Sequence, residues 1–265
     1  NSRPLYVHAL GDLNINSVLL GMRGLVKAGA GTLTISQPSM MGRDETDNNV
    51  NFVNEGTLQL AGGTNTLYFR APMVINGGKL DLNSTSQYTR ELMTDSTING
   101  GEIISTGGNG VLLANQQNTA RTWAGNIGGS TNDYVTFART GSNTLNITNA
   151  NTTVGKLILL NSTTSLIDAG SFANITGLTI SRATFAINNT GLYESTDRIN
   201  DSAAVTLKGG VLQFFGRANS ASAETLGVVT LEDSLSTIRA DRGATRRARF
   251  RQSGGRNRHR PDGAG

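Results

Sequence analysis

A glycine-punctuated strand unit returns along this chain at intervals of twenty-odd residues. Residues Gly24–Ile35 form a turn that leads into Gly-Thr-Leu-Thr-Ile, a short strand with apolar residues at alternate positions. The same pattern, or a looser version of it, follows at residues 56–60, 78–82 and 101–104. Repetition of one turn and one strand at this period is typical of a coiled stack of strands and not of a single globular sheet.

The spacing of the repeated apolar residue sets the size of the coil. Leu33, Leu58, Leu80 and Ile103 follow one another at intervals of 25, 22 and 23 residues. Roughly this many residues make one coil of a three-sided parallel β-helix, which needs three short strands and three turns. We therefore predict an all-β fold, a parallel β-helix (β-solenoid) with short side loops. In such a fold the four residues stack at the ~4.8 Å strand spacing as one inner ladder.

The composition agrees with an all-β fold. Apolar residues make up 37% and charged residues 16% of the 265 residues, and 33 residues are glycine. Turn-forming residues are too frequent for a helical protein, and Val, Leu, Ile and Thr are too frequent for a disordered one. An antiparallel β-sandwich or jelly roll is the alternative all-β fold. The repeated unit and the lack of Asn-Gly turns between strands of equal length favour the β-helix.

Missing residue types and motifs limit the chemistry of the chain. It has no cysteine, so it can form neither disulfides nor thiolate metal sites. With His8 and His259 as the two histidines, a buried Ser-His-Asp or Cys-His arrangement is not expected. No H-E-x-x-H, P-loop, G-x-S-x-G or EF-hand pattern occurs, and no apolar run approaches the ~18 residues that cross a bilayer. We expect no cofactor, no metal ion and no membrane span.

Between the glycine turns the sequence predicts strands of three to five residues, among them 17–20 and 66–69. Six pairs of adjacent glycines, from Gly62-Gly63 to Gly209-Gly210, are expected to supply positive φ at tight corners. Arg90–Met93 resembles a turn of helix. Three polar segments interrupt the strand pattern and are predicted to leave the coil as irregular loops, at residues 39–49, 87–96 and 115–122.

Charge divides the chain into two parts. Residues 241–265 hold eight arginines against two aspartates, a net charge of +6, so residues 1–240 carry −2 of the total charge of +4. We interpret residues 1–240 as the β-helix domain, whose charge gives no reason to expect nucleic-acid binding. Residues 241–265 form an Arg- and Gly-rich tail, which is either disordered or the product of an altered reading frame.

Two segments resemble the autotransporter-associated β-strand repeat of bacterial surface passenger domains. Gly24–Ile35 has the form G-L-x-K-x-G-x-G-T-L-T-I, and Trp123–Gly129 has the form W-x-G-x-I-x-G. The second copy continues into R-T-G-S-N-T-L-N-I, where Arg139 stands at the position that is usually lysine. Residues 198–212 are similar to arrays of such repeats in large secreted proteins.

The resemblance implies a right-handed parallel β-helix with a stalk or adhesive role and no catalytic residues, because the repeat is structural. It also implies export, to the medium or to the bacterial cell surface. No signal peptide is visible and the chain begins with Asn1, so we interpret it as a fragment of an exported surface protein. The expected partners are a host or matrix surface, polysaccharide among them, and further copies of the chain bound through the open solenoid ends.

The alternative function is a β-helical carbohydrate-active enzyme, a hydrolase or a lyase, that uses outward carboxylates. Two carboxylates within ~5–10 Å suit glycoside hydrolysis. Asp81 and Glu102 lie about one repeat apart near Lys79, and Asp44 and Asp47 lie in the first polar loop. The competing interpretation is that these are solvated residues on the outer face. Further carboxylates of this kind are Glu45, Asp95, Glu194, Asp197 and Asp201.

Aromatic side chains are the other candidates for binding a sugar. Trp123, Tyr134 and Phe137 lie close together in the second copy of the repeat. If exposed, they would form a platform for a sugar ring. If buried, they belong to the core and the end of a coil, which is the interpretation that we favour.

Overall fold

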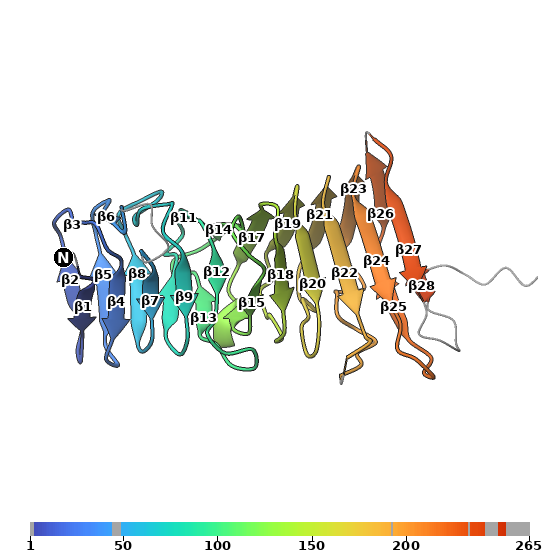
Figure 1. Ribbon diagram of the computed structural model, residues 1–265, viewed down its shortest axis with the longest axis horizontal. Helices are drawn as coiled ribbons and strands as arrows, with labels where there is room; N and C mark the ends of the chain where they lie inside the picture. The colour runs from blue at the N-terminus through green and yellow to red at the C-terminus, as the bar shows by residue number, and fades with distance from the viewer. Residues whose placement is uncertain (1–2, 44–48, 192, 233, 242–248, 253–265) are drawn as a thin grey trace, which may run out of the picture.

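The computed structural model of the protein describes residues 3–43, 49–191, 193–232, 234–241 and 249–252. These residues form a long stack of coils that runs the length of Figure 1. Every strand pairing that they make is parallel. Within the described ranges the helical structure amounts to one 3-10 turn, Gly129–Thr131. The predicted parallel β-helix is confirmed.

The strands line three faces. Face 1 begins with a five-stranded sheet and continues as a six-stranded one, and the two are joined where the amide of Thr94 donates to the carbonyl of Thr122 (2.9 Å). Its strands are β1 (Leu5–His8), β4 (Leu25–Ala28), β7 (Asn51–Val53), β9 (Met73–Ile75), β12 (Leu92–Met93), β15 (Arg121–Trp123), β18 (Thr144–Ile147), β20 (Thr163–Leu166), β22 (Thr184–Asn188), β24 (Val211–Phe215) and β27 (Thr237–Asp241).

Face 2 is regular in the first half of the chain and thinner in the second. Its strands are β2 (Leu13–Ile15), β5 (Thr32–Ile35), β8 (Thr57–Leu60), β10 (Lys79–Asp81), β13 (Glu102–Ile104) and β16 (Asn126–Ile127), followed later by β25 (Ala223–Leu226) and β28 (Arg249–Gln252). Between these two groups the coils meet through single bridges, Ala150 with Ser171 and Phe172 with Ile199.

Face 3 is the longest continuous sheet of the later coils. It starts with the short pair β3 (Leu20–Gly21) and β6 (Met40–Met41). Its seven-stranded part comprises β11 (Ser86–Thr89), β14 (Gly110–Asn115), β17 (Val135–Thr140), β19 (Lys156–Leu160), β21 (Gly177–Ser181), β23 (Ala204–Lys208) and β26 (Val229–Glu232).

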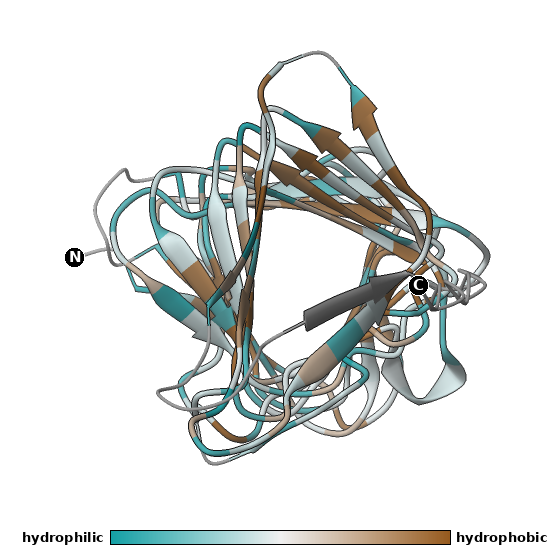
Figure 2. Ribbon diagram, turned by 90° about the vertical axis from the view of Figure 1, so that its right-hand side faces the viewer, coloured by the Kyte–Doolittle hydropathy of each residue, from teal (hydrophilic) through white to brown (hydrophobic). Residues whose placement is uncertain are grey.

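Viewed along the axis, the three faces form the sides of a triangle (Figure 2). Side chains alternate between the inside and the outside of each strand. In β5, for example, Leu33 and Ile35 are buried, whereas Thr32 and Thr34 are half-buried on the outer surface. The inner side chains form one apolar core of Leu, Ile, Val and Phe together with Trp123. Burial of this stacked core is the main stabilising contribution in a chain without disulfides.

The predicted inner ladder is confirmed by the strand register. Leu33 pairs with Leu58, Leu58 with Leu80, and Leu80 with Ile103. All four side chains are buried in the core cluster. The ladder extends by one coil in each direction, to Leu13 and to Ile127.

The lysine of the first repeat copy closes the corner between faces 1 and 2. Lys27 is fully buried in β4, and its ammonium group donates to the carbonyls of Ala28 (3.0 Å), Gly29 (2.6 Å) and, one coil further on, Glu55 (3.0 Å). The Glu55 carboxylate in turn accepts from the amide of Gly29 (3.0 Å), which has a φ of 80°. Carbonyls that a sharp turn leaves without a strand partner are thereby satisfied.

The prediction of an irregular segment with a helical turn at residues 87–96 is wrong, because β11 and β12 pass through it. Polar residues point inward there. Gln87 accepts from the amide of Thr66 (2.9 Å) and donates to the carbonyl of Gly63 (2.8 Å), and the hydroxyl of Thr89 donates to the carbonyl of Ala71 (2.9 Å). Buried polar side chains with full hydrogen bonding thus replace the apolar alternation that identifies a strand.

Other local predictions need adjustment. Residues 66–69 form a turn, and in the 17–20 segment the strand is reduced to Leu20 of β3. The 115–122 segment is irregular at 116–120, between β14 and β15. Of the 39–49 segment, Met40 and Met41 form β6, while residues 44–48 lie outside the described part of the chain.

Glycine pairs serve two different purposes. Gly63, Gly107, Gly108, Gly128, Gly129 and Gly209 have positive φ, as predicted. The pairs Gly77-Gly78 and Gly100-Gly101 do not. At Gly101 a Cβ atom would lie 2.0 Å from the carbonyl oxygen of Gly78, so glycine is needed there for the close approach of two coils.

Strand pairing continues beyond residue 240. The predicted domain boundary falls within β27, which pairs with β24, and β28 pairs with β25. The expectations of disorder or of an altered reading frame concern, for the rest, residues 242–248 and 253–265, which lie outside the described ranges. A search of the described residues for a helix long and apolar enough to span a bilayer finds none.

Candidate functional site

The predicted carboxylate pair lies on the outer side of face 2, where Glu102 is half-buried and Asp81 is buried. In the register of β10 and β13, Lys79 is opposite Glu102, and Asp81 is opposite Ile104. Asp81 and Glu102 are therefore two residues out of register on neighbouring strands. Lys79 forms an ion pair with Glu102 across the strands, with 2.8 Å between Nζ and Oε2. The structure thus brings all three predicted residues into one neighbourhood.

Asp81 is nevertheless enclosed by its own hydrogen bonds. Its Oδ1 accepts from the amides of Asn83 (2.9 Å) and Thr106 (2.9 Å), and its Oδ2 accepts from Nε2 of Gln59 (2.9 Å) and from the Thr106 hydroxyl. A carboxylate has about four lone-pair positions. All four are used, two by Thr106 of the next coil, one by Asn83 in the turn after β10 and one by Gln59 of β8. Asp81 therefore has no position left for a substrate or a water molecule.

Asp81 also ends a chain of hydrogen bonds across the coils. The hydroxyl of Thr34 donates to Oε1 of Gln59 (3.1 Å), and Gln59 donates to Asp81 (2.9 Å). The three residues are register partners on β5, β8 and β10. They form an outward polar ladder of the kind that stabilises stacked strands.

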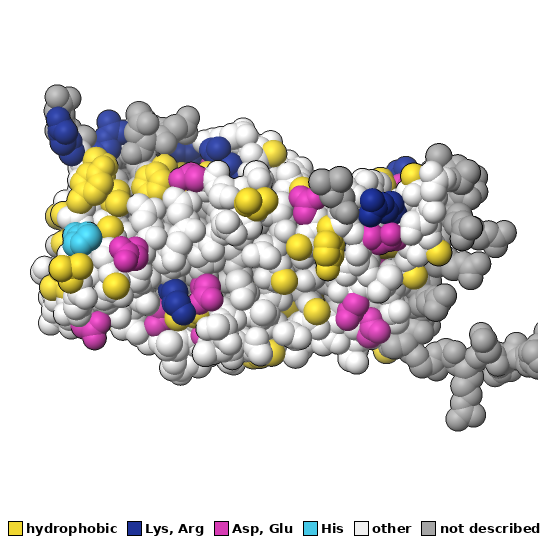
Figure 3. All heavy atoms as spheres, turned by 90° about the horizontal axis from the view of Figure 1, so that it is seen from below, with side chains coloured by type: hydrophobic (Ala, Val, Ile, Leu, Met, Phe, Trp, Pro, Cys, Tyr) yellow, Lys and Arg dark blue, Asp and Glu magenta, His cyan; other side chains and the backbone are white. Residues whose placement is uncertain are grey.

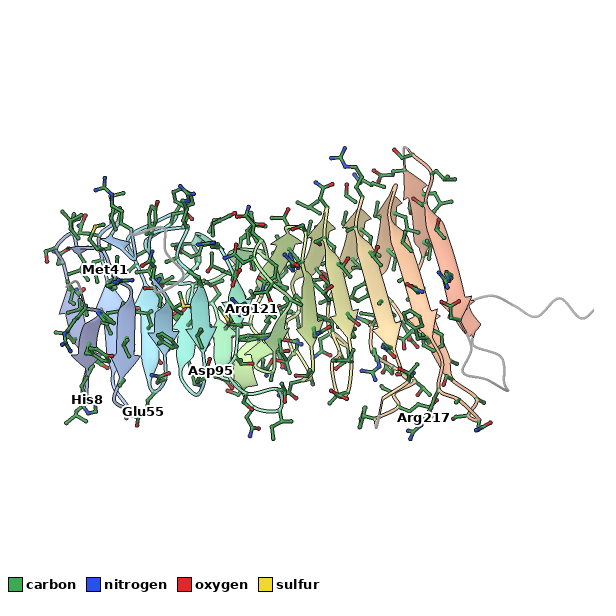
Figure 4. The ribbon with its side chains drawn as sticks, viewed as in Figure 1. His8, Met41, Glu55, Asp95, Arg121 and Arg217 are labelled. Carbon is green, nitrogen blue, oxygen red and sulfur yellow. The ribbon has the colours of Figure 1, made fainter. Side chains whose placement is uncertain are left out.

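Asp95 is the one other predicted carboxylate of the first hundred residues that the structure describes. Asp44, Glu45 and Asp47 lie outside the described residues. Asp95 accepts at Oδ2 from the side-chain amide of Asn76 (2.8 Å), which also bonds Asn54 (3.2 Å) in a corner ladder. Figure 4 shows His8, Glu55, Asp95 and Arg217 spread along one edge of the solenoid, far from a common centre.

The C-terminal carboxylates belong to a loop anchor. Serine hydroxyls hold the pKa of Glu194 below its usual range, since Ser220 and Ser222 both donate to it. Burial raises the pKa of Asp197, and the charge of Asp201 adds to the rise. Asp197 is therefore close enough to Asp201, and to the buried Glu224, for their charges to interact.

Glu224 is the buried acid that the sequence patterns did not single out. It points inward from β25 and accepts from the amides of Arg198 (3.0 Å) and Ile199 (2.8 Å). Burial raises the pKa of its carboxyl to about 7, against the opposing effect of these two amides. The strand alternation of Glu224 with Leu226 is the signal that could have revealed its inward direction.

Arg198 lies in the same buried cluster. Its guanidinium donates to Oδ1 of Asn189 (2.7 Å) and to the carbonyl of Gly170 (2.6 Å), and it lies 5.9 Å from the ring centre of Tyr193. Burial lowers its pKa. Together Arg198 and Glu224 fix the long excursion between β22 and β23. We assign the pair a structural role.

The aromatic residues of the second repeat copy belong to the core, as favoured from the sequence. Trp123 and Phe137 are fully buried, and the indole of Trp123 donates to Oδ1 of Asn151 (3.2 Å). Tyr134 is half-buried. Neither Trp123 nor Phe137 offers an exposed ring face of the kind that a sugar platform requires.

Exposed aromatic rings gather at a different place. Tyr68 and Phe69, in the turn before β9, have ring centres 5.2 Å apart, and Phe69 lies 5.9 Å from Tyr88 of β11 in an edge-on arrangement. Phe69 is 44% exposed. The rings form one wall of a recess at the corner between faces 3 and 1.

The rest of this recess is polar and positively charged. Its volume is about 380 Å³, and Arg70, Arg90, Asn115 and Gln117 line it beside the three aromatic residues. Nδ2 of Asn115 donates to the hydroxyl of Tyr88 (2.7 Å). No carboxylate is among these lining residues. We refer to these seven residues as the aromatic–arginine recess.

Elsewhere the surface has little charge, and exposed apolar side chains such as Leu10, Leu20 and Met22 lie on the first coils. The face seen in Figure 3 consists mostly of uncharged side chains and backbone, and several of its charges lie beside charges of the opposite sign. Lys208 pairs with Glu232 (2.6 Å) in the same way as Lys79 pairs with Glu102. Among the residues that the structure describes, no group of three or more His, Asp or Glu side chains could hold a metal ion.

No known protein family matches the chain, and comparisons with curated proteins and with solved structures found no match either. The function is therefore inferred from the geometry of the solenoid and of its surface.

Proposed function

We propose that this protein is a structural and adhesive β-solenoid of an exported bacterial surface protein, which binds through its surface and has no catalysis of its own. One observation supports this most directly. Asp81 is one of the two acids of the predicted catalytic pair, and both of its carboxylate oxygens accept hydrogen bonds from other residues of the solenoid. Glu102 is paired with Lys79.

The other features support the same proposal. A stack of coils with an uninterrupted apolar core is a rigid spacer, because each coil is fixed by its neighbours. Its outer surface offers repeated hydroxyl and amide groups, such as the Thr34–Gln59–Asp81 ladder. Export to the medium or to the cell surface remains part of this proposal, and it rests on the likeness of Gly24–Ile35 and Trp123–Ile147 to passenger-domain repeats.

Binding and catalysis can be separated in one experiment. The purified protein is incubated with insoluble matrix polysaccharides and with soluble acidic and neutral ones. Retention on the solid and release of reducing or unsaturated sugar ends are both measured. We expect retention without depolymerisation. Release of sugar ends that disappears in Asp81→Asn or Glu102→Gln would support the hydrolase or lyase alternative instead.

Association of copies through the solenoid ends is a second part of the proposal. Leu13 belongs to the inner ladder but is 42% exposed, and Leu231 is 67% exposed although its register partner Leu207 is fully buried. At each end of the described coils, an apolar ladder is therefore open to solvent. A second copy of the chain can continue both the ladder and the strand pairing head to tail.

A further inference from the structure

We propose that the aromatic–arginine recess binds a stretch of acidic polysaccharide, one that carries carboxylate groups on its sugar rings. The inference rests on the proposed adhesive function and adds to it a site and the chemistry of a ligand. The exposed ring of Phe69, two half-buried tyrosines, arginines and side-chain amides meet in this recess and line a volume of about 380 Å³. That volume falls within the roughly 300–1,000 Å³ of small-ligand sites.

The aromatic wall supplies the apolar contact. Phe69 is 44% exposed, and its ring contacts those of Tyr68 at 5.2 Å and Tyr88 at 5.9 Å between ring centres. A ring held in this way can pack against the C–H face of a sugar with little loss of side-chain freedom. The Tyr88 hydroxyl is already oriented by Asn115, which keeps the wall rigid.

The two arginines supply the preference for acidic sugars. Arg70 and Arg90 are among the described residues that line the recess, and no carboxylate is among those residues. A guanidinium has five N–H donors in a planar fork that matches a carboxylate, so an arginine engaged by the protein still has donors for a ligand. Two such groups in one site favour a ligand that carries carboxylates over a neutral one.

The amides supply contacts for hydroxyl groups. Asn115 and Gln117 lie next to each other on the same corner, at the end of β14 and just beyond it. Each amide can both donate and accept, as recognition of sugar hydroxyls requires. Asn115 is buried and donates one hydrogen to Tyr88, whereas Gln117 is exposed and offers its amide to a ligand.

The arrangement along the axis suits a linear chain. The lining residues come from three segments, 68–70, 88–90 and 115–117, that follow one another at this corner. Successive coils are about 4.8 Å apart, so the recess extends about 10 Å along the solenoid. Neighbouring sugar units of one polymer would therefore contact the same corner on neighbouring coils.

The test uses hexamers of galacturonate and of hyaluronan, with the methyl ester of the galacturonate hexamer as a neutral counterpart of the same shape. Binding is measured by titration calorimetry at low and at moderate salt. We expect at least one acidic hexamer to bind, with salt-dependent affinity, and the methyl ester to bind at least tenfold more weakly. Equal binding of the acid and its ester would overturn the inference.

Variants locate the site. Phe69→Ala is expected to weaken binding about tenfold, and Arg70→Gln and Arg90→Gln are each expected to weaken binding and to reduce its salt dependence. Tyr6→Ala removes an aromatic ring that is 71% exposed on β1, outside the recess, and should leave the affinity unchanged. Circular dichroism of each variant verifies folding. Unchanged affinity in a folded Phe69→Ala and in both arginine variants would contradict the assignment.

The outcome also separates this inference from the proposed function. If the protein is retained on a matrix but binds neither acidic hexamer, the recess is not the site and the adhesive function stands. If the protein is retained on no matrix at all, the adhesive function itself fails.

Discussion

Lys27 and Arg139 perform the same task at two different corners of the solenoid. Each is fully buried at the end of a strand, two residues before a glycine of positive φ, Gly29 or Gly141. Lys27 donates to the carbonyl of the next residue and, one coil on, to that of Glu55 (3.0 Å).

Arg139 repeats this arrangement. It donates to the carbonyls of Thr140 and Asn143 and, one coil on, to that of Thr163 (3.4 Å). Burial lowers the pKa of Lys27, and burial lowers the pKa of Arg139 to about 10, a value at which Arg139 stays charged near neutral pH. The basic residue of the repeat is therefore a cap for corner carbonyls, and arginine can replace lysine because both are donors.

Removing the Lys27 ammonium should destabilise the protein. Lys27→Met keeps a stem of similar length but leaves the carbonyls of Ala28, Gly29 and Glu55 without this donor. We expect a loss of about 1–3 kcal/mol in the free energy of unfolding, measured by urea denaturation. Lys79→Met, which removes a half-exposed ion-pair partner, is the control and should cost less than about 1 kcal/mol. Equal stability of the two variants would contradict the capping role.

Glu224 should make stability depend on pH. Its folded pKa of about 7 is above its ordinary value of 4.5, so between these values the folded state binds more protons than the unfolded state. The free energy of unfolding should therefore fall as pH rises from about 4.5 to about 7, by at most about 3 kcal/mol.

The measurement compares urea unfolding of the wild type and Glu224→Gln at pH 5 and at pH 8. The substitution should reduce the fall in the free energy of unfolding between these pH values, because glutamine does not titrate. Glutamine can still accept from the amides of Arg198 and Ile199, so the fold is kept. Asp197, whose pKa is also raised, contributes in the same direction to both proteins. Glu232→Gln, at an exposed ion pair, is the control. If the free energy of unfolding of Glu224→Gln falls between pH 5 and pH 8 as much as that of the wild type, Glu224 is not the source of the pH dependence.

Asp81→Asn should affect stability and leave binding intact. The new NH2 group would replace one carboxylate oxygen and would face groups that now donate to that oxygen. At Oδ2 these are the side chains of Gln59 and Thr106, and at Oδ1 they are the backbone amides of Asn83 and Thr106. We expect a loss of about 1–3 kcal/mol by urea unfolding, with retention on a matrix unchanged at temperatures where the variant is folded. A fully stable variant would show that these hydrogen bonds contribute little to the scaffold.

The sequence predicts the stack but not all of its strands, for a physical reason. Leu33, Leu58 and Leu80 are recognised because apolar alternation and the preceding glycine are local signals. Gln87 and Thr89 also point inward, but their polar side chains are satisfied by backbone groups of other segments, which only the folded coil supplies. A strand whose inward side chains are polar therefore has the sequence pattern of a loop.

The recess was missed because its residues do not occupy equivalent positions in successive coils. The register partner of Tyr88 is Leu113, 25 residues on, whereas Asn115 lies two residues further along β14. Tyr68 precedes Tyr88 by 20 residues, which is fewer than the ladder spacing of 22 to 25. Which side chains share a corner therefore depends on the turns, and their conformation is fixed by packing. The Asp81–Glu102 neighbourhood, in contrast, lies on regular strands and could be predicted, although the hydrogen bonds that enclose Asp81 could not.

Association through the ends is open to a direct test. In the proposed head-to-tail contact Leu231 is buried by a second copy, so Leu231→Lys would place a charge in an apolar contact and should abolish association. Ile98→Lys is the matched control, because Ile98 is 75% exposed on the side of the solenoid and not at its end. Sedimentation velocity over a range of concentrations should show a rising sedimentation coefficient for the wild type and for Ile98→Lys, and a constant one for Leu231→Lys.

A wild type that stays monomeric at the highest concentration would show that the exposed ladders do not pair with one another. Head-to-tail pairing is favoured over lateral pairing because Leu13 and Leu231 expose inner-ladder positions at the two ends of the described coils, where a second copy can also continue the strand pairing.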